Sequence, residues 1–83
     1  MIQMLDAKDF TVFVTGATSG IGQATCRRFA QAGAKVIATG RRTDRLQALA
    51  RELGSACHIA ALDVRDRVAV EAVVAALPQK FAP

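Results

Sequence analysis

The stretch from Phe10 to Gly22 constrains the fold most, because an apolar run leads without a break into a glycine-rich turn. Residues 11–14 favour a pleated strand, and the unbroken run is typical of a strand that is buried on both faces. The residues that follow Gly22 predict a helix. Strand, glycine turn and helix in this order place free backbone N–H groups and a positive helix end beside an anion. The sequence therefore predicts an anion-binding turn.

The length and the charge of the chain limit the classes of protein to consider. A chain of 83 residues forms one small domain with a thin core. It has no apolar run of the roughly 18 residues that a membrane span requires, and the first nine residues lack a signal peptide's apolar centre. We expect residues 1–9 to be a flexible lead-in, residues 10–83 to form the domain, and the protein to be cytoplasmic and not bound to a membrane.

The net charge of +4 fits a nucleic acid or a phosphorylated small molecule as the partner, or merely a soluble surface. Seven other basic residues, however, are expected to scatter over helix faces with no aromatic residues between them: Arg27, Arg28, Arg45, Arg51, Arg65, Arg67 and Lys80. A nucleic-acid groove would need them clustered, so we expect no nucleic-acid partner.

Apolar spacing and turn residues predict strands that alternate with helices. Three strands are expected, at residues 10–15, 34–39 and 57–62. Three helices are expected, at residues 20–32, from an N-cap at Thr43 or Asp44 to Gly54, and from about Asp66 to Pro78. Right-handed crossovers between parallel strands give the strand order 3-2-1, the first half of a doubly wound α/β sheet. Such a sheet leaves an edge of the first strand unpaired, so we expect the chain to be a fragment or to pair with another chain there.

The glycine turn has the spacing Gly16-x-x-x-Gly20-x-Gly22. Gly16 would give a tight exit from the strand, Gly20 would let the backbone approach a pyrophosphate, and Gly22 would let the helix pack close to the sheet. The hydroxyls of Thr18 and Ser19 can hydrogen-bond to phosphate oxygens. A strand before the turn and a helix after it are the context that makes such spacing a dinucleotide-binding signal. The alternative is a turn that serves packing only.

The residues after the second strand choose between the two nicotinamide dinucleotides. NAD-binding proteins place an acidic residue there to bond the ribose 2′-hydroxyl. Here Arg41 and Arg42 follow the strand, and their guanidinium groups fit the 2′-phosphate of NADP. We therefore expect NADP as the cofactor, the alternative being a solvated arginine pair at a strand end.

Asp63 and Val64 stand at the end of the third strand, at the same edge of the sheet. The Asp63 carboxylate can accept a hydrogen bond from an adenine amino group, with Val64 beside it. The alternative is that Asp63 caps the following helix. We expect His58 to be a half-buried strand residue, Cys26 and Cys57 to be reduced and packed thiols, and no metal site to form.

The residues from Thr15 to Gly22 resemble the T-G-x-x-x-G-x-G cofactor motif of the short-chain dehydrogenases/reductases, and the resemblance extends from Phe10 to the C-terminus. Residues 38–42 and 62–65 are similar to those of a branch of this family, the bacterial NADP-dependent 3-hydroxy acid (serine-oxidising) dehydrogenases. The resemblance implies the first half of a Rossmann-type fold. It also implies an oxidoreductase that exchanges hydride between NADP and a small hydroxy acid, alcohol or carbonyl substrate, usually as a homo-oligomer, a tetramer.

The resemblance also assigns roles to single residues. The pyrophosphate and ribose would be contacted by Gly16, Thr18, Ser19, Gly20 and Ile21. Arg41 and Arg42 would hold the 2′-phosphate, and Asp63 and Val64 would contact the adenine. The family's catalytic Ser and its Tyr-x-x-x-Lys pair are expected beyond the end of this chain, which contains no tyrosine. We therefore expect no catalytic residue and no turnover by this chain alone. A non-catalytic NADP(H)-binding module, or an inert fragment that lacks a complete site, remains the alternative.

Overall fold

The computed structural model describes residues 8–82, and residues 1–7 and 83 lie outside the description. Of the lead-in expected at residues 1–9, only Lys8 and Asp9 are described, and they form a turn. The strands and helices alternate as predicted, with bounds that differ from the expected ones by at most three residues. The elements are β1 (Thr11–Val14), α1 (Gly20–Gln31), β2 (Lys35–Gly40), α2 (Thr43–Leu53), the 3₁₀ turn η1 (Gly54–Ala56), β3 (Cys57–Ala61), α3 (Arg67–Ala75) and the 3₁₀ turn η2 (Gln79–Phe81).

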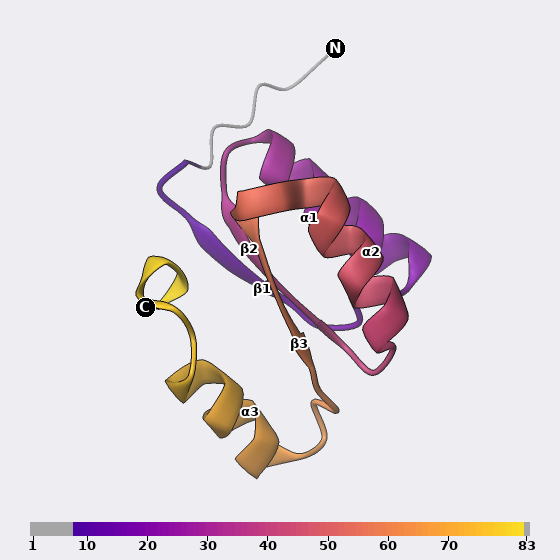
Figure 1. Ribbon diagram of the computed structural model, residues 1–83, viewed down its shortest axis with the longest axis vertical. Coiled ribbons are helices and arrows are strands. Elements are labelled where there is room, and N and C mark those ends of the chain that lie inside the picture. The colour runs from indigo at the N-terminus through magenta and orange to yellow at the C-terminus, as the bar shows by residue number, and fades with distance from the viewer. Residues whose placement is uncertain (1–7, 83) are drawn as a thin grey trace.

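The three strands form one parallel sheet in the order β1-β2-β3, which confirms the predicted order. Val12 of β1 lies opposite Val36 of β2, and Ala38 of β2 lies opposite Ile59 of β3. Helices α1 and α2 lie together on one side of the sheet, whereas α3 and η2 lie on the other (Figure 1). Because the strands are parallel, the carboxyl ends of all three meet at one end of the sheet.

The core lies between β2 and the two helices α1 and α2. Its buried side chains include Cys26 from α1, Val36 and Ala38 from β2, and Leu46 and Leu49 from α2. Burial raises the pKa of the Cys26 thiol, and it raises the pKa of the Cys57 thiol to about 11. Both cysteines are free and mostly protonated at neutral pH, so they are packing residues rather than nucleophiles.

The expectation that the first strand is buried on both faces is wrong. Thr11 and Phe13 of β1 are exposed, and Val12 and Val14 are only half-buried. Within residues 8–82, β1 has β2 as its single neighbour, so it lies at an edge of the sheet. The strand that is buried almost throughout is β2, because it lies between two strands.

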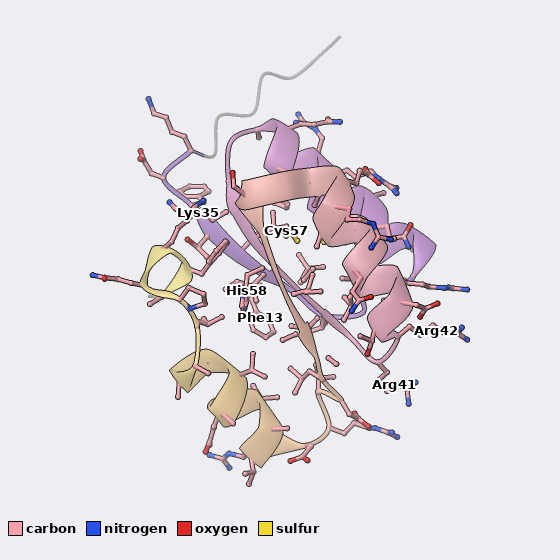
Figure 2. All side chains as sticks on the ribbon, viewed as in Figure 1. Phe13, Lys35, Arg41, Arg42, Cys57 and His58 are labelled. Atoms are coloured by element: carbon pink, nitrogen blue, oxygen red, sulfur yellow. The ribbon has the colours of Figure 1, made fainter. Side chains whose placement is uncertain are left out.

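The second face of the sheet carries a row of side chains in register. Phe13 lies opposite Ile37, and Ile37 lies opposite His58. Phe81 of η2 covers this row, with its ring centroid 5.5 Å from that of His58. Figure 2 shows Phe13 and His58 between the sheet and the C-terminal segment. His58 is half-buried, as predicted, and serves packing.

The start of α2 differs from the prediction. Neither Thr43 nor Asp44 is the N-cap, because the helix begins at Thr43 and the capping position falls on Arg42, whose side chain makes no capping bond. Strand β2 extends to Gly40 rather than Thr39, so only Arg41 and Arg42 remain to connect strand and helix.

Thr39 connects β2 to β1 and to the glycine turn. Its side chain is fully buried, and its hydroxyl donates to the Val14 carbonyl at 3.0 Å. Its own carbonyl accepts from the Ala17 N–H at 2.9 Å. The turn is therefore held against the end of β2 by hydrogen bonds at a buried position.

Replacement of Thr39 by valine should remove the hydroxyl bond at nearly constant volume. We expect Thr39→Val to lower the free energy of unfolding by about 1–3 kcal/mol, because the Val14 carbonyl loses a buried donor. Urea denaturation followed by circular dichroism measures this. Thr11→Val, at an exposed position of β1, is the control and should leave the stability nearly unchanged. Equal stability of both variants would show that the buried bond contributes nothing.

Candidate functional site

A hollow of about 680 Å³ lies where the strands end and the glycine turn begins. Seven of the nine predicted site residues line it, contributed by the turn and by the segments that follow β2 and β3. They are Gly16, Thr18, Ser19, Arg41, Arg42, Asp63 and Val64. The topology therefore brings together residues that are almost 50 positions apart in the sequence.

The other two predicted residues, Gly20 and Ile21, lie next to the hollow as the first residues of α1. Within residues 8–82 their backbone N–H groups donate to no protein acceptor, which leaves them free for an anion at the helix N-terminus. An added Cβ at Gly20 would meet nothing within 4 Å, so the backbone is open on that side. The Ile21 side chain is 84% exposed, and it can serve the site only through its backbone.

The turn holds its shape through two of its glycines. Gly16 has φ of +64°, in the left-handed region, which gives the chain its tight exit from β1. Gly22 packs against the turn rather than against a strand, because a Cβ there would overlap the carbonyl oxygen of Gly16 and lie 2.8 Å from Ala17 Cα. Gly22 therefore allows close packing, as predicted, but the packing is against the turn and not against the sheet.

The two hydroxyl groups of the turn differ in whether they are already used in hydrogen bonds within the protein. The Ser19 hydroxyl donates to the Gly16 carbonyl at 2.8 Å and accepts from the Gly22 N–H at 3.0 Å, so it caps α1. The Thr18 hydroxyl has no hydrogen-bond partner among the described residues. It lies beside Gly40, where an added Cβ would come within 3.3 Å of Thr18 Oγ1. Thr18 is therefore the hydroxyl that remains able to bond a phosphate oxygen.

Arg41 and Arg42 extend into solvent beyond the end of β2, next to the glycine turn (Figure 2). Both are exposed, and no carboxylate among residues 8–82 forms an ion pair with either of them. Unpaired guanidinium groups at the rim of a hollow are suited to a phosphate dianion, which they can hold through charge-assisted hydrogen bonds.

Asp63 is held by Arg65, two residues further along the chain. Asp63 Oδ1 accepts from the Arg65 backbone N–H and from Arg65 Nε, each at 3.0 Å, while Oδ2 accepts from Arg65 Nη2 at 2.8 Å. These bonds, together with the nearby charge of Arg41, keep the pKa of Asp63 well below its usual range. The alternative role for Asp63 as a helix cap is wrong, because Asp66 caps α3 by accepting from the Ala69 N–H at 3.1 Å.

Three lining residues were not predicted from the sequence: Gly40, Leu62 and Arg65. Arg65 was expected on a helix face, but it lies in the loop between β3 and α3. The spacing Asp-x-Arg is a signal that could have found it, because an Asp in a turn often bonds the backbone two residues on. Within residues 8–82 no three His, Cys, Asp or Glu side chains gather where they could hold a metal ion. No helix in that range has both the length and the apolar character to span a membrane.

Comparisons with known proteins agree with this geometry. The family model of the short chain dehydrogenases matches residues 10–83. Serine 3-dehydrogenase of Agrobacterium fabrum (strain C58) is 59% identical over 71 residues, which cover 86% of this chain and 28% of that protein. The NADP-dependent 3-hydroxy acid dehydrogenase of Escherichia coli (strain K12) is 57% identical over 70 residues, covering 84% of this chain and 28% of that protein. The chain thus spans less than a third of the length of these relatives.

A solved structure, the closed form of serine dehydrogenase complexed with NADP+, superposes with a TM-score of 0.84 at 56% identity. The match covers 87% of this chain and 29% of that one. The structure of serine dehydrogenase from Escherichia coli gives a TM-score of 0.83 at the same identity, and covers 33% of that chain.

Proposed function

Because this chain belongs to the short chain dehydrogenase family, we propose that its hollow binds the adenosine 2′-phosphate half of NADP(H). The observation that carries the proposal is the pair Arg41 and Arg42, which have no carboxylate partner among residues 8–82 and stand where an NAD-binding protein needs an acidic residue. An acidic side chain there would bond a 2′-hydroxyl and repel a 2′-phosphate, whereas the two arginines attract the phosphate.

The pyrophosphate lies, in this proposal, at the N-terminus of α1. The free N–H groups of Gly20 and Ile21 and the hydroxyl of Thr18 donate to its oxygens, and the positive end of the helix favours its charge. The adenine lies over Val64, which is half exposed. Asp63 accepts from the adenine amino group with the lone pairs that Arg65 leaves free.

We propose that the protein to which these residues belong is an NADP-dependent oxidoreductase acting on a small hydroxy acid, alcohol or carbonyl compound. Its relatives serine 3-dehydrogenase and NADP-dependent 3-hydroxy acid dehydrogenase support this class of substrate. The bound nicotinamide supplies the hydride chemistry. In this proposal the residues of this chain bind and orient the cofactor. Family resemblance also favours a homo-oligomer, which light scattering can test.

The experiment that tests the proposal is a calorimetric titration with NADP and, separately, with NAD. We expect NADP to bind at least about tenfold more tightly, since one additional charge-assisted hydrogen bond contributes about 1.5–3 kcal/mol. Adenosine 2′,5′-bisphosphate and adenosine 5′-monophosphate repeat the comparison without the nicotinamide half. A 2′-phosphate site would be contradicted if NADP bound no more tightly than NAD and the bisphosphate no more tightly than the monophosphate. If none of these four ligands bound, a cofactor site in this chain would be contradicted.

A further inference from the structure

We propose that Arg65 is a cofactor-selectivity residue, which cancels the charge of Asp63 and so keeps the hollow favourable to a 2′-phosphate. This inference rests on the proposed function and deepens it. Two arginines beyond β2 attract the phosphate, yet the same hollow contains a carboxylate that would oppose it. Arg65 resolves this conflict within the site.

The geometry of the pair is specific. Arg65 Nε and Nη2 face the two carboxylate oxygens of Asp63, at 3.0 and 2.8 Å, in the parallel arrangement that fits a guanidinium to a carboxylate. The backbone N–H of Arg65 donates to the same carboxylate, so the turn that carries the arginine also fixes the distance. No lysine could reproduce this fork, because an ammonium group is a point charge.

The electrostatics of the hollow depend on this pair. Its charged lining residues are Arg41, Arg42, Asp63 and Arg65, so removal of Arg65 would lower its formal charge from +2 to +1. The positive charge that is lost is the one beside Asp63. The Asp63 carboxylate lies close enough to Arg41 for these two charges to interact. An unpaired Asp63 would then compete with the phosphate for Arg41.

The pair has little to do with the stability of the fold. The Arg65 side chain is 78% exposed and that of Asp63 is 37% exposed, and such surface ion pairs contribute little to folding. Arg65 belongs to no helix or strand, and α3 is capped by Asp66 instead. An effect of Arg65 on cofactor choice can therefore be measured in a folded protein.

The test uses Arg65→Ala, Asp63→Asn and the double variant, with Arg67→Ala as the matched control. Arg67 is also exposed and ion-paired, to Glu71, but it lies on α3 outside the hollow. Calorimetry gives the dissociation constants for NADP and for NAD. We expect Arg65→Ala to weaken NADP binding about tenfold and NAD binding less than about twofold, since a charge beside the site discriminates between partners that differ in charge. Arg67→Ala should change neither by more than about twofold.

The double variant separates cancellation of charge from direct contact. If Arg65 acts by neutralising Asp63, Asp63→Asn in the Arg65→Ala background should return NADP affinity to within about threefold of wild type, because the repelling charge is gone. The effect of Arg65→Ala should also shrink as salt is raised from 0.05 to about 0.5 M, since surface charges are screened. The asparagine retains a carbonyl that can accept from an adenine amino group.

Three results would overturn the inference and leave the proposed function standing. They are an unchanged ratio of NADP to NAD affinity in Arg65→Ala, an equal effect of Arg67→Ala, and a double variant as weak as Arg65→Ala. Wild-type protein that binds neither dinucleotide would instead remove the proposed function, and this inference with it. Circular dichroism spectra of all variants establish that they remain folded.

Discussion

Gly22→Ala should unfold the chain, the largest effect expected of any single substitution here. The added Cβ would overlap the Gly16 carbonyl oxygen and lie 2.8 Å from Ala17 Cα, and all of these neighbours are backbone atoms that cannot rotate away. Overpacking typically costs about 1–3 kcal/mol and occasionally more, and the rigid backbone neighbours place this site at or above the upper end. A single core of this size seldom provides more than about 3–5 kcal/mol in total. Circular dichroism should therefore show loss of helix and of cooperative melting.

Gly20→Ala is the matched control for this prediction. It lies two residues earlier in the same turn of α1, where an added Cβ meets nothing within 4 Å and φ is not in the left-handed region. We expect its stability to be unchanged or raised by up to about 1 kcal/mol, because alanine favours the helix. NADP binding should nevertheless weaken, since the methyl group would stand where the pyrophosphate approaches. A folded Gly22→Ala variant as stable as Gly20→Ala would contradict the packing described here.

The combined change Arg41→Ala and Arg42→Ala should abolish the preference for NADP over NAD. Each guanidinium is exposed and free of carboxylate partners among the described residues, so its charge is available to a ligand. Loss of both should raise the dissociation constant for NADP roughly 100-fold, about 3 kcal/mol in sum, and change that for NAD little. Calorimetric titrations with the two dinucleotides measure both constants.

The control for this pair removes the same charge elsewhere. Arg51→Ala with Arg67→Ala takes two exposed arginines from α2 and α3, outside the hollow. If the preference depends on local contacts, this control should alter NADP affinity by less than about threefold at moderate salt, because distant surface charges are screened. Equal losses in the two double variants would show that general attraction by a basic protein, and not a 2′-phosphate site, produces the affinity.

Local patterns in the sequence were sufficient to predict the order of the elements, the order of the strands and most residues of the hollow. The glycine spacing lies directly between a strand and a helix, so Gly16 and Thr18 could be placed without knowledge of distant contacts. Arg41 and Asp63 could be placed because parallel strands end at one edge of the sheet. These inferences need only neighbouring residues and a topology rule.

The features that could not be predicted from the sequence depend on contacts between distant residues or on the exact residue at which a helix or strand ends. The exposure of Phe13 follows from the position of β1 at an edge, which its own apolar run cannot reveal. The cap of α2 falls on Arg42 because β2 continues through Gly40. The bond from Arg65 to Asp63 depends on a turn between β3 and α3, whereas Arg65 is expected on a helix face from the sequence.

Amide NMR during a titration with NADP shows whether the hollow beyond the three strand ends is the cofactor site that we propose. We predict that the amide shifts that change will cluster at residues 16–21, 40–42 and 62–65, and that Arg41 and Arg42 will change less with NAD. The chemical shifts of amides near His58 and Phe81, on the second face of the sheet, should not change. Shift changes centred on that face, or none in the hollow at saturating NADP, would contradict a cofactor site in the hollow.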